Sequence, residues 1–96
     1  MNYDLLTVDE IRAAAADLPA QVRRTPTLPL IEEPDGGGYL YAKCENLQQT
    51  GSYKLRAAFT VLGRLSADQR ARGAALSSSG NFAAAFAYAG RVLGIP

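Results

Sequence analysis

The sequence predicts an α/β fold, the beginning of a parallel sheet with helices between its strands. Apolar segments of strand length alternate with segments in which apolar residues recur at helical spacing. Turns rich in glycine, serine and proline separate these segments. Such alternation is typical of parallel sheets. Because the last expected helix ends just before Pro96, we expect the chain to stop within a domain, ahead of the strand that should follow.

Three helices and three strands are expected. A capping-box spacing between Thr7 and Glu10 precedes the first helix, and Pro19 follows it. Gly94 stands in the C′ position after the last helix. The strands are short and apolar, and one is rich in aromatic residues. The helices are expected over residues 11–18, 53–65 and 81–93, and the strands over residues 28–31, 39–44 and 74–76.

The connections and the last helix complete the expected organisation. Residues 33–38 are predicted to form a hairpin turn or another loop, and residues 66–73 a polar connection. The helix over residues 81–93 is apolar almost all round, so we expect it to be buried. The Gly36–Gly38 run lacks a following helix and a Lys-Ser/Thr pair, so it is interpreted as a flexible turn and not as a phosphate loop.

Composition excludes several classes of function. The chain has 96 residues and a net charge of +1, with acids and bases scattered, so no basic stripe for nucleic acid is present. No apolar run approaches a membrane span, and the first residues do not resemble a signal peptide. The single cysteine, Cys44, suits a reducing cytoplasm and is interpreted as a small core residue. The absence of histidine argues against histidine-based triads and most zinc sites, and we expect no metal.

Lys54 is the first candidate catalytic residue. It follows a Gly-Ser-Tyr turn that starts at Gly51 and it opens a helix. A lysine that acts as a nucleophile needs a neutral amine, whereas an ordinary lysine is protonated at neutral pH. The positive end of the helix dipole and partial desolvation both disfavour the ammonium form. The alternative interpretation is a solvated lysine on an amphipathic helix.

The second candidate is the turn Ser78, Ser79, Gly80 and Asn81, which opens the last helix. Free backbone N–H groups at a helix N-terminus favour a carboxylate or a phosphate, and Gly80 lets the backbone approach a ligand closely. The alternative is ordinary capping by Ser79 or Asn81. A lysine followed by an anion-binding turn indicates chemistry on an amine and a carboxylate, and therefore on an amino acid.

The stretch around Lys54 resembles the signature of pyridoxal-phosphate enzymes of fold type II, in the threonine/serine dehydratase branch beside serine racemase. The Ser78–Asn81 turn with its alanine-rich helix is similar to the substrate loop of that family. Ala57 departs from the usual glycine, and Phe82 from the histidine that commonly follows the asparagine. The residues that fall on pattern positions are Lys43, Glu45, Gln48, Thr50, Gly51, Ser52, Tyr53, Lys54 and Arg56.

The resemblance implies a fold, a cofactor and a reaction. Residues 1–96 would be the N-terminal portion of a catalytic domain with a tryptophan synthase β-like parallel sheet, truncated after the substrate-loop helix. Pyridoxal 5′-phosphate would be the cofactor. The reaction would turn threonine or serine into a 2-keto acid and ammonia, with no nucleic-acid or membrane partner, and the full-length form would be a homo-oligomer.

The resemblance also implies roles for individual residues. Lys54 would carry the cofactor and take the α-proton of the substrate. Tyr53 would pack its ring against the cofactor, and Asn81 would hydrogen-bond the cofactor's phenolic oxygen. The carboxylate of the substrate would be held by Ser78, Ser79, Gly80 and Asn81.

Three alternatives stay open. Racemisation shares the first steps of the dehydratase reaction. A cysteine-synthase-like β-replacement fits less well, because that branch favours Asn-Pro and Val-Lys-Asp-Arg around its lysine. A chain of this length is also compatible with a non-catalytic remnant that acts only as an interaction fragment. A glycine-rich phosphate loop encoded beyond Pro96 would favour the enzyme over the remnant.

Overall fold

The computed structural model describes residues 4–32 and 38–96, so most of the expected turn over residues 33–38 lies outside the described residues. Within them the chain forms four α-helices, two strands and one short 3-10 helix. The elements are α1 (Val8–Ala16), β1 (Thr27–Glu32), β2 (Tyr39–Lys43), η1 (Glu45–Leu47), α2 (Lys54–Gly63), α3 (Ala67–Arg72) and α4 (Asn81–Leu93).

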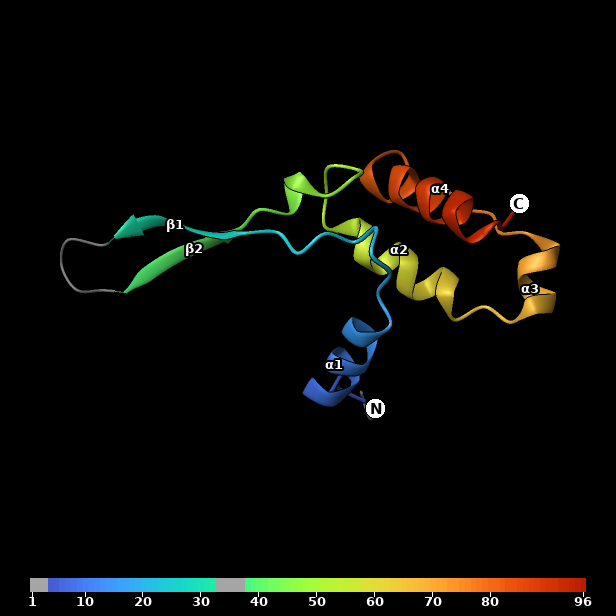
Figure 1. The fold of residues 1–96 in the computed structure, drawn as a ribbon, viewed down its shortest axis with the longest axis horizontal. Helices are drawn as coiled ribbons and strands as arrows, with labels where there is room; N and C mark the ends of the chain where they lie inside the picture. Colours follow the sequence, from blue (N-terminus) through green and yellow to red (C-terminus); the bar gives the residue numbers. More distant parts are fainter. Residues whose placement is uncertain (1–3, 33–37) are drawn as a thin grey trace.

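The molecule is elongated, with extents of 56 × 35 × 26 Å. Figure 1 shows β1 and β2 reaching out at one end, while α2 and α4 lie side by side in the middle and α3 closes the opposite end. The helix α1 stands beside α2 and contributes no buried residue. Consequently the tightly packed part of the described chain is the α2–α4 pair.

The two strands form an antiparallel hairpin, with Thr27 opposite Lys43 and Glu32 opposite Tyr39. The register is irregular between Pro29 and Ile31. This irregularity fits a proline, which has no N–H to donate to the ladder. The two strands were expected close to these bounds, but the parallel pairing predicted for the sheet is not what the described strands adopt.

The strand expected over residues 74–76 is wrong for the described chain, because these residues are not in a strand. A strand needs a neighbouring strand, and the two-stranded sheet pairs only β1 with β2. The backbone N–H of Ala74 instead donates to the carbonyl of Pro96 at 3.0 Å. This bond brings the segment before α4 alongside the C-terminal residue.

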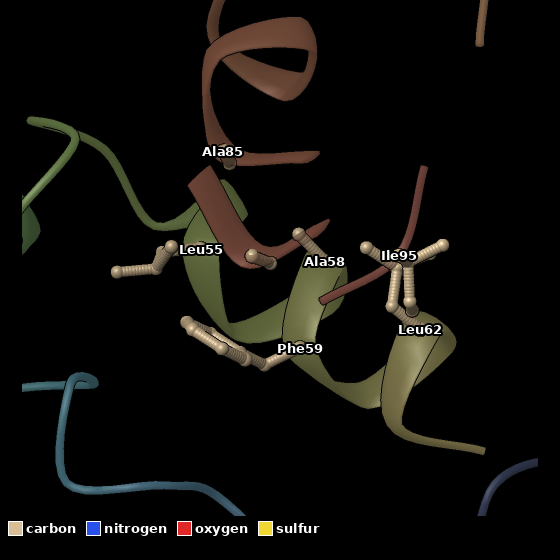
Figure 2. Packing of buried hydrophobic residues seen from close by; sticks show 7 residues of the cluster. Leu55, Ala58, Phe59, Leu62, Ala85 and Ile95 are labelled. Carbon is tan, nitrogen blue, oxygen red and sulfur yellow. The ribbon is translucent and has the colours of Figure 1, made fainter. Parts of the chain in front are cut away.

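The core lies where α2 and α4 meet, as Figure 2 shows. Small residues on α4, Ala85 and Ala89, are fully buried and let the two helices approach closely. Leu55 and Leu62 are the largest fully buried side chains. The buried apolar residues are Leu55, Ala58, Phe59, Leu62, Ala85, Ala89 and Ile95.

Two capping boxes begin α1 and α3. Thr7 and Glu10 form the first, which confirms the sequence prediction. Ser66 and Gln69 form the second, so the polar connection predicted over residues 66–73 is wrong and contains a helix. The Arg70 side chain of that helix donates to the carbonyl of Gly63 at 3.0 Å. It therefore satisfies backbone acceptors at the C-terminal end of α2.

The helix α4 has the predicted bounds and the predicted stop. Gly94 has a left-handed conformation with φ 67°, its N–H donates to Arg91, and the N–H of Ile95 donates to the carbonyl of Gly90 at 2.8 Å. These bonds form a Schellman motif. Burial differs from the expectation, because only one side of α4 is covered and Ala87 and Arg91 remain exposed. Among the described residues, no helix is long and apolar enough to span a membrane.

Candidate active site

A tight turn places Lys54 at the first position of α2. Gly51 adopts φ 79°, which favours glycine, and its N–H donates to the carbonyl of Gln48 at 2.9 Å. Ser52 is buried, and its hydroxyl accepts from the N–H of Lys54 at 3.4 Å. The turn therefore fixes where the helix begins, and with it the position of the lysine backbone.

The amine of Lys54 lies between two aromatic rings. Its Nζ is 5.1 Å from the ring centroid of Tyr53 and 5.9 Å from that of Phe82. Tyr53 is 61% exposed, so its ring is not a core aromatic and one face of the site is open. Neither ion pair found within residues 4–32 and 38–96 involves Lys54. A half-buried lysine with aromatic neighbours differs from the solvated lysine of the alternative interpretation.

The chain contains a second lysine in different surroundings. Lys43 ends β2, is exposed, and donates from Nζ to the carbonyl of Thr25 at 3.1 Å. Its amine therefore has a backbone partner, whereas that of Lys54 faces rings. Lys43 can therefore serve as an internal control for Lys54 in any reaction that needs an accessible amine.

The Ser78–Asn81 turn opens α4 without a side-chain cap. Gly80 is the N-cap residue, and the hydroxyl of Ser78 accepts only from the N–H of Gly80, at 3.4 Å. The capping roles considered for Ser79 and Asn81 are therefore not observed. All four residues of the turn are exposed. A Cβ built on Gly80 would meet nothing within 4 Å, so space is open where a ligand would approach.

The lysine turn and the serine-rich turn meet at one end of the helix pair. Lys54 at the start of α2 lies near Phe82 at the start of α4, and Leu62 near the end of α2 lies 4.0 Å from the position a Gly90 Cβ would take. The two helices therefore run in the same direction (Figure 1). Both positive dipole ends face this region, which favours an anion there.

Side-chain caps are distributed unevenly over the helices. The N-termini of α1 and α3 are closed by complete capping boxes, whereas the N-cap residues of α2 and α4, Tyr53 and Gly80, make no side-chain cap bond. The uncapped ends are the two that meet beside Lys54. The backbone donors left there can serve a bound carboxylate or phosphate.

Behind Lys54, a carboxylate joins the first turn of α2 to the segment before β1. Glu45 pairs with Arg56, whose Nε donates to one carboxylate oxygen and whose Nη2 donates to the other at 3.2 Å. The Thr25 hydroxyl and the Gln48 amide donate to the same second oxygen, at 2.6 and 3.1 Å. The Glu45 side chain is only 14% exposed. We refer to Glu45, Arg56, Thr25 and Gln48 as the Glu45 cluster.

The cluster keeps its carboxylate ionised. The hydrogen bond from Arg56 lowers the pKa of Glu45 to about 2, and those from Thr25 and Gln48 act in the same direction against the effect of burial. In return, the hydrogen bond to Glu45 raises the pKa of Arg56. The pair is therefore fully charged at neutral pH.

Gln48 extends the cluster to the backbone of Arg23. Its amide accepts from the Arg23 N–H and donates to the Arg23 carbonyl, both at 2.8 Å. Gln48 is 4% exposed, and this pair of bonds satisfies its buried amide. The segment before β1 is thus bound to the turn that carries the lysine.

Sequence reasoning identified the two turns but not how the Glu45 cluster is assembled. Glu45, Gln48 and Arg56 were named only as pattern positions, with no role. Their partners in the segment before β1 lie 20 to 33 residues away in the chain. The available signal was an acidic and a basic residue, Glu45 and Arg56, among the pattern positions. The sequence-based expectation for Cys44 is adjusted slightly, because it follows β2 and is half-buried.

One buried polar atom near the lysine has no partner. Thr50 Oγ1, four positions before Lys54, is buried without a hydrogen bond in the part of the chain that the structure describes. Buried hydroxyls are normally satisfied, so this atom has a donor and an acceptor to offer. Within residues 4–32 and 38–96, no cluster of three metal-ligating side chains forms.

The arrangement places an amine beside the N-termini of two helices, and the comparison with known families gives the class of protein. The sequence model of the pyridoxal-phosphate dependent enzymes matches residues 18–96. The chain therefore belongs to this family, whose cofactor is pyridoxal phosphate. No solved structure matches the chain significantly.

Curated relatives have related activities. L-threonine ammonia-lyase of Thermotoga maritima is 38% identical over 96% of this chain and 23% of its own length. L-threo-3-hydroxyaspartate ammonia-lyase of Pseudomonas sp is 39% identical over 96% of this chain and 29% of its own length. Serine racemase of Schizosaccharomyces pombe is 34% identical over 99% of this chain and 30% of its own length. The chain thus spans roughly a quarter to a third of the relatives it matches.

Proposed function

We propose that this chain is the N-terminal, lysine-bearing part of a pyridoxal-phosphate-dependent ammonia-lyase that acts on a β-hydroxy amino acid such as threonine or serine. The observation that carries the proposal is the position of Lys54 at the start of α2, beside the uncapped start of α4. Family membership and the lyases among the relatives support it.

The residues around Lys54 fit the cofactor. An amine that has no acidic partner among the described residues suits bonding to an aldehyde, and the exposed ring of Tyr53 suits stacking on a flat pyridine. Asn81 opens α4 and would hold the phenolic oxygen of the cofactor. When bound, pyridoxal phosphate supplies the electron sink that stabilises negative charge at the α-carbon of the substrate.

The other residues of the site act on the substrate. Ser78, Ser79, Gly80 and Asn81 would hold its carboxylate through backbone N–H groups at the start of α4 and through their side chains. This binding would orient the α-proton toward the amine of Lys54. The amine would then take that proton as a general base. Loss of the β-hydroxyl and hydrolysis give a 2-keto acid and ammonia.

Comparing the two lysines tests the proposal. In the full-length holoenzyme, borohydride should fix the cofactor to Lys54, and peptide mass spectrometry should find the label there. Lys54→Ala should abolish the label and lower keto-acid release by at least about a thousandfold. Lys43→Arg should keep both, because the Lys43 amine is held at the Thr25 carbonyl. A label on Lys43 in the unaltered protein would refute the assignment.

Racemisation is the second candidate, supported by the similarity to serine racemase. Both reactions begin with removal of the α-proton, so the residues named above do not separate them. Product analysis does: chiral chromatography measures the opposite enantiomer of serine, and a coupled assay measures keto acid. We expect keto acid to exceed the inverted amino acid. The reverse ratio would replace the lyase with a racemase.

A further inference from the structure

We propose that Glu45 is a positioning residue, which through Arg56 sets the direction in which the side chain of Lys54 leaves α2. The inference rests on the proposed function, since it concerns the same lysine. It assigns a role to the Glu45 cluster, which touches neither the rings around Lys54 nor the Ser78–Asn81 turn in the bonds that the structure records.

The geometry of the first turn of α2 carries the argument. Arg56 follows Lys54 by two residues, and side chains two positions apart on an α-helix point about 200° apart around its axis. Arg56 points to Glu45, and Lys54 points to the start of α4, 5.9 Å from the Phe82 ring. A helix held on one side by Arg56 therefore cannot turn without moving Lys54 on the other.

The bonds of Arg56 define an orientation as well as an attachment. Its Nε and Nη2 donate to the two different oxygens of Glu45, so the guanidinium and carboxylate planes are held together. The same Nη2 reaches the carbonyl of Arg23 at 3.4 Å. A single contact would leave the helix free to rotate, whereas this forked pair with a third contact restricts rotation.

The residues that hold Glu45 in addition to Arg56 are themselves fixed in place. Thr25 and Gln48 hold the carboxylate, and Gln48 makes two bonds to the Arg23 backbone. The segment continues into the hairpin, because the Cys44 N–H donates to the Pro26 carbonyl at 2.9 Å. At the start of α2, the N-cap residue Tyr53 makes no side-chain cap bond, and the Ser52 hydroxyl holds only the backbone N–H of Lys54, at 3.4 Å. The Glu45 cluster therefore supplies directional restraint that the lysine turn lacks.

Glu45→Gln in the full-length holoenzyme tests the role. The variant keeps the size of the side chain but removes the charge that pairs with Arg56 and replaces one acceptor oxygen with an NH2 donor. We expect kcat to fall by about 10- to 100-fold while KM changes by less than about threefold, since misdirection of the reacting amine affects the chemical step. Circular dichroism in the visible band of the bound cofactor should change, and borohydride should fix the cofactor to Lys54 more slowly.

Asp9→Asn is the matched control. Asp9 and Arg12 form the other ion pair of the described residues, at 3.3 Å on the surface of α1. Removing its charge should leave kcat, the dichroism band and the borohydride rate unchanged. A second variant, Thr25→Val, removes one bond to the Glu45 carboxylate and leaves the ion pair, so it covers the case in which Glu45→Gln does not fold. It should change the dichroism in the same direction, less strongly.

The outcomes distinguish a positioning role of Glu45 from a purely stabilising role. They also distinguish failure of this proposal from failure of the proposed function. A lower thermal midpoint with unchanged kcat and dichroism in both variants would limit the Glu45 cluster to stabilising the fold, and would overturn the proposal. If the unaltered holoenzyme released no keto acid, the proposed function would fail. The dichroism band and the borohydride rate at Lys54 would then still decide on positioning.

Discussion

At the scale of single residues, the ionised state of Glu45 makes stability depend on pH. Arg56 holds the folded-state pKa of Glu45 at about 2, below the ordinary 4.5. A carboxyl whose pKa is lowered by folding contributes its full stability above the unfolded-state value and loses it as pH falls through the folded-state value. We therefore expect the contribution to be complete above about pH 5 and lost by about pH 2.

The contribution of Glu45 to pH-dependent stability is limited, because its partner Arg56 is partly exposed to solvent. The shift corresponds to about 3 kcal/mol, but the Arg56 side chain is 34% exposed, so we expect on the order of 1–2 kcal/mol. Urea unfolding at several pH values should show this loss, and Glu45→Gln should flatten the curve between pH 5 and 2. Glu10→Gln is the control: Thr7 also lowers the pKa of Glu10, but that carboxyl lies on the surface. Equal flattening by both variants would contradict the special role of Glu45.

Gly80 carries a second prediction at this scale. Its φ of −149° lies outside the left-handed region that favours glycine, and a Cβ there meets nothing of the described chain within 4 Å. A variant with a side chain at this position should therefore fold, and that side chain should occupy the space beside the N-terminus of α4. We expect Gly80→Val to raise KM for threonine or serine by at least about tenfold, with Gly80→Ala intermediate. Steady-state kinetics measure this effect.

Gly63 provides the control for that prediction. It also has open surroundings and ends α2, far along the helix from Lys54. Gly63→Ala should leave KM unchanged. An unchanged KM in Gly80→Val would show that the Ser78–Asn81 turn does not approach the substrate.

At the scale of elements, local signals predicted the helices well where capping and periodicity agreed. The bounds of α4 and its stop at Gly94 follow from its apolar spacing and one glycine, and α1 from its capping box. The helix α3 was missed although Ser66 and Gln69 carry the capping-box spacing, because six mostly polar residues give no apolar period.

The predictions that failed depend on partners distant in the chain. Residues 74–76 have strand composition, but the backbone bond recorded for them in the described chain runs from the Ala74 N–H to the Pro96 carbonyl and not to a neighbouring strand. The direction of the sheet is an exception, because β1 and β2 are close in the chain and a connection as short as theirs suits antiparallel pairing. The Glu45 cluster could not be predicted, because its partners are distant in the chain. Contacts over 20 to 33 residues leave no periodic pattern.

The α2–α4 interface should tolerate loss of volume poorly. Leu62 is 1% exposed and packs near Gly90 and Ile95, so Leu62→Ala leaves a cavity that costs about 2–5 kcal/mol. Val61, its neighbour in the same helix, is 51% exposed, and Val61→Ala should cost less than about 1 kcal/mol. Thermal unfolding of the two variants measures the difference. Similar losses would mean that the helix pair is not the core of the protein.

At the scale of the whole molecule, much apolar surface lies outside the α2–α4 core. A groove of about 440 Å³ runs along α4, lined by apolar residues that include Leu76, Phe86 and Ile95. The hairpin and the N-terminal region add large exposed side chains. Exposed apolar side chains in these places favour association. The most exposed of these residues are Leu5, Leu6, Val8, Ile11, Leu30, Tyr39 and Tyr41.

This surface and the candidate site together predict how the 96-residue chain behaves when produced by itself. It holds Lys54 and two uncapped helix ends, but the glycine-rich phosphate loop that the family resemblance implies lies outside it. Backbone N–H groups of such a loop contribute much of the cofactor's binding. We therefore expect weak binding of pyridoxal phosphate, no turnover, and self-association. Absorbance titration, keto-acid assay and analytical ultracentrifugation measure these three properties, and a soluble monomer that releases keto acid from threonine would contradict the prediction.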